Sequence, residues 1–194
     1  MVGGFYYLYN MNIVPPSKPK MTKKEVLSLV KSIYPEFVIP DFFIVGVRGY
    51  YKKTMGDPTK NDRMIYDDAI FLIGSKDYFA AFNANTDPST FKKGVAVLKA
   101  GIHEYKKGKH GLSKPSGGYP ALRPANPKEE LPVTRDGKDS TGIAINIHKG
   151  SLNSPSSLGC QTIFKSQWDE FITNTYSQMD LYKMKDVDYV LLEQ

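Results

Sequence analysis

Residues 36–105 contain a succession of short apolar segments of strand length, separated by turn-forming residues. The segments at 68–73 and 78–83 flank Gly-Ser-Lys-Asp at 74–77, a pattern typical of a β-hairpin. Further segments of this kind lie at 42–51, 94–99, 102–105 and, near the C-terminus, 188–192. A chain built this way buries its apolar side chains on sheets, so we expect a mainly β protein.

Two amphipathic segments predict helices beside these strands. Thr22-Lys23-Lys24-Glu25 is a capping box, and apolar residues at helical spacing follow it until Pro35 ends the pattern. A second helix is expected from Ser166 onward, with Trp168 as a core anchor. The expected class is therefore α+β, mainly β with flanking helices. The 194 residues suit one domain, which we place at 21–194 after an extended, proline-rich arm at 1–20.

Alternation is strict from Gly142 to His148, which predicts one continuous strand. The three isoleucines of this segment share one face, and Asn146 and His148 lie on the other. If the isoleucines enter the core, His148 points out of it.

The chain has a single cysteine, Cys160, which follows His148 after a loop of small residues. A single cysteine excludes an internal disulfide and leaves a buried thiol or a reactive one. A thiol attacks as the thiolate, and a neighbouring histidine lowers its pKa or accepts its proton. The segment therefore predicts a cysteine nucleophile, Cys160, with His148 as its base.

His148-Lys149-Gly150 and Ser157-Leu158-Gly159-Cys160 together resemble the catalytic motif of the L,D-transpeptidase family. The resemblance implies a β-sandwich fold, acyl transfer through Cys160, and an oxyanion hole of backbone N–H groups near Gly159. Leu158 stands where the family carries a second histidine, and Gln161 follows the cysteine where the family carries arginine or asparagine. The oxyanion-binding or substrate-binding residues that we expect are Gly159, Ser157, Gly150, Asn146, Gln161, Tyr119 and Arg123.

Other segments resemble a family of phage-encoded proteins; they lie at 48–51, 61–63, 83–88 and 156–162. This resemblance implies a cell-wall hydrolase of the endolysin type that cleaves the peptidoglycan stem peptide. Cross-link formation by the same chemistry is the alternative. The N-terminal residues lack the pattern of a signal peptide, so we expect synthesis in the cytoplasm and action at the bacterial cell wall.

The net charge of +6 favours anionic partners, including the acidic polymers of a bacterial wall. The lysines are scattered and the arginines form no cluster, so we expect no nucleic-acid partner. No apolar run approaches the roughly 20 residues that span a bilayer, so we expect no membrane insertion. We also expect a monomer that needs no cofactor and no metal.

Two rival functions remain at this stage. A zinc peptidase would use His103, His110 and His148, with Glu104 nearby, although no metal-binding spacing joins them. If these histidines bind no metal, we expect His103 to be a half-buried strand residue and His110 to lie in a solvated turn. The second rival is a non-enzymatic phage structural or wall-binding module in which Cys160 is buried and inert.

Overall fold

The structure is a computed structural model that describes residues 12–57 and 62–194. The expected arm at 1–20 lies partly outside the described residues, and so does Asn61 of the phage-like segments. The described part of the arm, 12–20, packs against the body of the protein. The Ile13 carbonyl accepts a 2.7 Å hydrogen bond from Tyr66 N–H, and Pro15 and Pro19 are buried.

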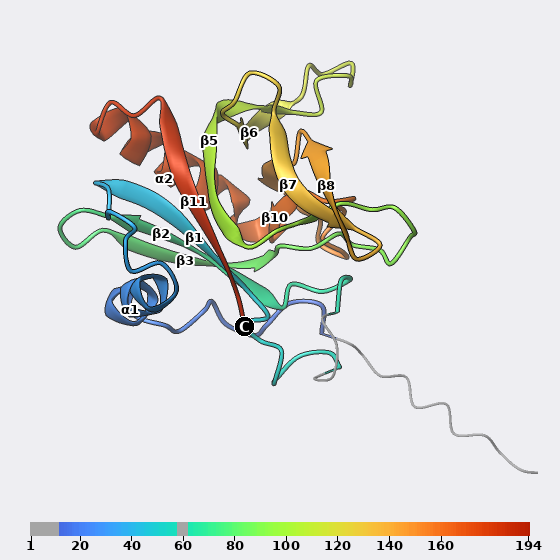
Figure 1. Cartoon of the computed structure of the whole chain (residues 1–194), viewed down its shortest axis with the longest axis horizontal. Coiled ribbons are helices and arrows are strands. Elements are labelled where there is room, and N and C mark those ends of the chain that lie inside the picture. Colours follow the sequence, from blue (N-terminus) through green and yellow to red (C-terminus); the bar gives the residue numbers. More distant parts are fainter. Residues whose placement is uncertain (1–11, 58–61) are drawn as a thin grey trace, which may run out of the picture.

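Most strands belong to one closed, eight-stranded barrel (Figure 1). Around the barrel their order is β1 (Phe42–Arg48), β11 (Asp186–Glu193), β5 (Gly101–His110), β6 (Tyr119–Pro124), β9 (Ile147–Lys149), β10 (Gln161–Ile163), β3 (Phe79–Asn85) and β2 (Asp68–Gly74). The mainly β prediction is confirmed. The sandwich prediction is not confirmed, because β2, the last strand in this order, pairs back with β1 and closes the sheet into a barrel.

A separate three-stranded sheet lies beside the barrel, formed by β4 (Val97–Leu98), β7 (Glu130–Arg135) and β8 (Lys138–Ile143). β7 and β8 meet at a tight turn in which Asp136 and Gly137 both have positive φ, 50° and 76°. Positive φ at both central residues is the geometry that Asp-Gly favours in hairpins, as expected from the sequence. β8 leads directly into the segment that carries His148.

The two helices cover different faces of the sheet (Figure 1). α1 (Lys23–Ile33) begins with the predicted capping box and buries Val26 and Val30 against outward-facing residues of β1 and β2. α2 (Trp168–Leu181) follows a short 3₁₀ turn at Lys165–Gln167 and belongs to the other core cluster. β1 and β2 are buried on both faces for this reason, which explains their unbroken apolar sequences.

The predicted continuous strand at 142–148 is wrong. β8 ends at Ile143, Ala144 takes φ of 55°, and β9 begins only at Ile147. The left-handed Ala144 breaks the alternation: Ile143 is exposed, whereas all four residues of 145–148, Asn146 and His148 among them, are buried. His148 therefore lies in a pocket wall, not on an open face. Ala144 has no sequence signal for this conformation, since alanine rarely adopts it.

Candidate active site

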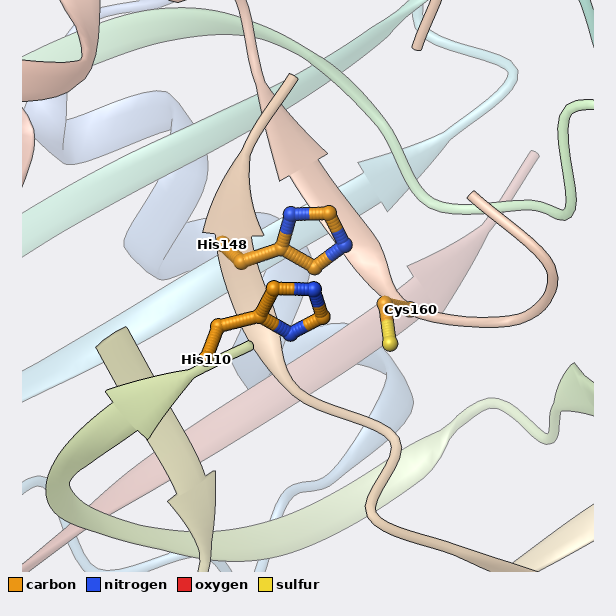
Figure 2. A group of neighbouring side chains, drawn as sticks. All are labelled: His110, His148 and Cys160. Carbon is orange, nitrogen blue, oxygen red and sulfur yellow. The ribbon is translucent and has the colours of Figure 1, made fainter. Parts of the chain in front are cut away.

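Three side chains from separate parts of the chain lie close together (Figure 2). His110 comes from the last residue of β5, His148 from β9, and Cys160 from the loop that enters β10. One ligand-type atom of each lies within 4.8 Å of the others. The parallel pairing of β9 with β10 brings two of the three side chains together. It places Thr162 opposite His148, and Cys160 comes two residues before Thr162.

His148 is held firmly, with 4% of its surface exposed. Its Nδ1 lies 2.9 Å from the carbonyl oxygen of Lys149 and 3.2 Å from the hydroxyl of Tyr119. A carbonyl only accepts, so Nδ1 carries the proton and Nε2 keeps its lone pair. Burial lowers the pKa of His148 to about 4, and the neighbouring His110 adds to this effect. The ring is therefore a neutral base with its Nε2 available.

The sequence named His110 only as a ligand of the rival zinc site and did not place it beside Cys160. We expected a solvated turn, but β5 continues to His110, which pairs with Tyr119 of β6. Its ring stacks on that of His148, with centroids 3.8 Å apart and planes 17° apart. The lysine-rich sequence Lys106–His110 gives no strand signal of its own. Only the pairing with β6 extends the strand, and that contact is invisible in either segment alone.

The Cys160 thiol has two backbone contacts. Its Sγ donates to the carbonyl oxygen of Ala144 at 3.6 Å and accepts from Asn146 N–H at 3.4 Å. Burial raises the pKa of the thiol. A neutral thiol thus faces a neutral imidazole, which is the arrangement for proton transfer during attack rather than for a preformed ion pair.

The thiol opens into a pocket of about 350 Å³. The pocket is lined by His110, Ile143, Ala144, Ile145, His148, Ser156, Ser157, Leu158, Gly159 and Cys160. Leu158 and Ile143 stand at its edge as exposed apolar side chains.

The loop before the nucleophile is shaped by Ser157. Its Oγ donates to the Cys160 carbonyl at 2.6 Å and accepts from Gly159 N–H at 3.0 Å. That N–H is therefore already occupied, whereas the Cys160 N–H has no hydrogen-bond acceptor among the described residues. Gly159 has φ of 150°, and a Cβ there would lie 2.8 Å from the Ala96 carbonyl oxygen. Glycine is thus required here by packing against Ala96.

None of the other expected site residues lines the pocket. Tyr119 contacts His148 as described, and the Asn146 amide lies 3.1 Å from His110 Nδ1. Gln161 points inward to the Tyr189 hydroxyl at 3.1 Å. Arg123 forms an ion pair with Glu129 and donates to the Lys109 carbonyl. Gly150 is buried where a Cβ would overlap the Tyr66 hydroxyl.

The three-histidine zinc site is not formed. His103 lies near the opposite end of β5 from His110, where its Nε2 is 2.8 Å from the Lys99 carbonyl oxygen. His103 and Glu104 border a different cavity. Of the expected ligands, only His110 and His148 come together, and their third neighbour is Cys160.

No helix in the described part of the chain is long and apolar enough to cross a membrane. Comparison of the chain with protein-family models, with curated proteins and with solved structures found no match.

Proposed function

We propose that this protein is a cysteine enzyme that transfers acyl groups on the stem peptide of bacterial peptidoglycan, with hydrolysis as the main outcome. One observation carries the proposal: the only cysteine of the chain opens into a pocket whose wall holds a neutral, oriented imidazole. The resemblance of 148–160 to the L,D-transpeptidase motif supports the same pair. The β-sandwich of that family is implied by the resemblance alone, because the strands described above pair into a closed barrel.

In the proposed reaction, His148 Nε2 accepts the thiol proton while Cys160 Sγ attacks the amide carbon. The negative charge on the oxygen is stabilised by the Cys160 N–H, the backbone donor left free beside the thiol. The imidazolium then protonates the leaving amine as the C–N bond breaks, and a thioester remains. Water then attacks the thioester and gives one proton to His148. The C–S bond breaks, the imidazolium returns that proton to the leaving thiolate, and the carboxylic acid is released.

His110 acts as a positioning residue in this scheme. Its ring covers one face of the His148 imidazole, and His148 Nδ1 is fixed by Lys149 and Tyr119. Together these contacts limit rotation of the base. Leu158 occupies the motif position of the family's second histidine, and its side chain lies at the rim of the pocket, not against the base.

The acceptor decides between the two outcomes of this chemistry. An amine that reaches the thioester forms a cross-link, whereas water cleaves the peptide. The net charge of +6 favours approach to an acidic wall polymer in either case. A wall-binding module without catalysis would place no demand on the orientation of His148.

The decisive experiment is digestion of purified peptidoglycan, with products identified by mass spectrometry. The wild type should release shortened or separated stem peptides, and Cys160→Ala and His148→Gln should reduce the rate by at least about a thousandfold. His103→Gln is the matched control, because His103 lies outside the pocket, and it should retain activity. New cross-links in place of cleavage would assign the transpeptidase reaction. Equal digestion by wild type and Cys160→Ala would refute the proposal.

A further inference from the structure

His110, His148 and Cys160 offer two imidazole nitrogens and one sulfur within 4.8 Å of one another. These are ligand types that zinc prefers. Zinc sites with three protein ligands keep a fourth position for water or another exchangeable ligand. Figure 2 shows both rings facing the side on which the Cys160 sulfur lies. The pocket supplies the open fourth position, because all three residues line it.

We propose that these three residues bind one Zn²⁺ ion and that the bound ion blocks Cys160 as a nucleophile. Binding replaces the thiol proton: the S–H bond breaks, an S–Zn bond forms, and the proton leaves to solvent. The ion also occupies the Nε2 lone pair that the base would use. The blocking of catalysis rests on the proposed function, whereas the binding of zinc does not.

The groups behind the ligands suit this role. Zinc-bound histidines donate their second ring N–H to a carbonyl or similar acceptor, which fixes the ring and its tautomer. His148 does so already through Nδ1 and the Lys149 carbonyl at 2.9 Å. For His110 the neighbour is the buried Asn146 amide, 3.1 Å from Nδ1. The Asn146 Oδ1 has no hydrogen-bond partner in the described part of the structure. Reversing the amide would let that oxygen accept from His110 Nδ1–H.

Only a modest adjustment separates the observed cluster from a zinc site. Zn–N bonds of about 2.0–2.1 Å and a Zn–S bond of about 2.3 Å place tetrahedral ligand atoms about 3.3–3.6 Å apart. The stacked rings, 17° from parallel, aim their lone pairs side by side, so one ring must turn. His110 is the ring that we expect to turn. It is less buried than His148, and it ends β5 just before the loop 111–118.

The single cysteine makes the proposal directly testable, because alkylation of the chain reports on one thiol alone. The metal-free protein is treated with iodoacetamide at increasing zinc concentration, and intact mass gives the rate. Zinc at about ten times its Kd should slow alkylation about tenfold, since only the free form reacts. Calorimetry should give one zinc ion per chain. His110→Gln should bind zinc at least about tenfold more weakly, whereas His103→Gln should behave as the wild type.

The outcomes separate this proposal from the proposed function. No protection of the wild-type thiol by zinc would overturn the site and leave the cysteine mechanism standing. Equal protection in wild type and His110→Gln, with circular dichroism showing that both proteins are folded, would mean that zinc binds the thiol without His110. That result would also overturn the proposed site. Protection without any digestion of peptidoglycan by the metal-free protein would support the zinc site and refute the enzyme. Zinc inhibition of digestion, reversed by a chelator, would support both.

Discussion

The ring of His148 is oriented by its Nδ1 contacts, which determine the nitrogen that faces the thiol. The Lys149 carbonyl at 2.9 Å selects the tautomer, and the Tyr119 hydroxyl at 3.2 Å adds a second, longer contact. The sequence indicated that Tyr119 belongs to the site. It did not indicate that Tyr119 acts through His148 rather than on substrate.

Tyr119→Phe should lower kcat for peptidoglycan digestion about two- to tenfold and leave KM nearly unchanged. The magnitude is that of one lost hydrogen bond, because the Lys149 carbonyl still holds the tautomer. Steady-state kinetics on a soluble stem peptide would measure both constants. Tyr51→Phe is the matched control, since its hydroxyl contacts Ser17 and Asn83 away from the pocket. An unchanged kcat in Tyr119→Phe would show that the second contact is without effect.

Asp67 is a buried carboxyl group whose protonation should make stability depend on pH. It is 2% exposed, and its Oδ1 has no hydrogen-bond partner in the described structure. Burial, followed by the charge of Asp68, raises the pKa of Asp67 to about 9. The folded pKa lies above the ordinary aspartate value of 3.8, so the folded state holds a proton that the unfolded state releases.

The free energy of unfolding should therefore fall as pH rises from about 4 to about 9. Asp67→Asn keeps the shape without the titrating proton, so it should flatten this dependence and be more stable than the wild type at pH 8. Urea unfolding at pH 5 and pH 8 would measure both effects. Asp77→Asn, at an exposed position, should retain the wild-type dependence. The same slope in Asp67→Asn and wild type would assign the pH dependence to other groups.

At the scale of elements, α1 is the element whose start is determined most directly by neighbouring residues in the sequence. The Thr22 hydroxyl accepts from Glu25 N–H at 3.3 Å, and the Glu25 carboxylate accepts from Thr22 N–H at 2.7 Å. Both bonds satisfy donors that the first turn of a helix cannot pair internally. The helix then covers β1 and β2 through Val26 and Val30.

Thr22→Ala should cost about 1 kcal/mol of stability, the usual value for a lost N-cap. For a chain of this size that lowers Tm by about 2–4 °C, which thermal unfolding followed by circular dichroism would detect. Ser28→Ala is the control, because Ser28 is exposed within the same helix and caps nothing. A Tm loss of the same size in both variants would contradict the capping role.

Elements defined by contacts within a few residues were predictable from the sequence. The hairpin of β2 and β3, the Asp136-Gly137 turn and the capping box of α1 are of this kind. The candidate pair Cys160 and His148 was found because a short loop joins them. The place of His110 beside Cys160 was missed because pairing between distant strands brings it to the site. Ala144 was missed because its left-handed backbone depends on surrounding contacts and not on its own preference.

At the scale of the whole molecule, the length of the pairing between neighbouring strands varies around the barrel. β1 pairs with β2 through six residue pairs and with β11 through five. Around the candidate site the ladders are shorter: three pairs between β9 and β10, two between β10 and β3, and one between β6 and β9. We therefore expect the barrel to be held together least strongly at β9, which carries His148, and at β10, which follows Cys160.

Backbone amides in β9 and β10 should therefore exchange with solvent at least about tenfold faster than those in the middle of β1, which corresponds to a local opening cheaper by about 1.4 kcal/mol. Fewer ladder bonds must break to release these strands, whereas β1 is held on both sides and buried on both faces. Native-state hydrogen exchange read by mass spectrometry would compare the segments, with the middle of β11 as an internal reference. Equal protection in β9, β10 and β1 would show that the barrel opens only as a unit. In that case the pocket would be rigid, and a bulky stem peptide would have to fit the cavity of about 350 Å³ as it stands.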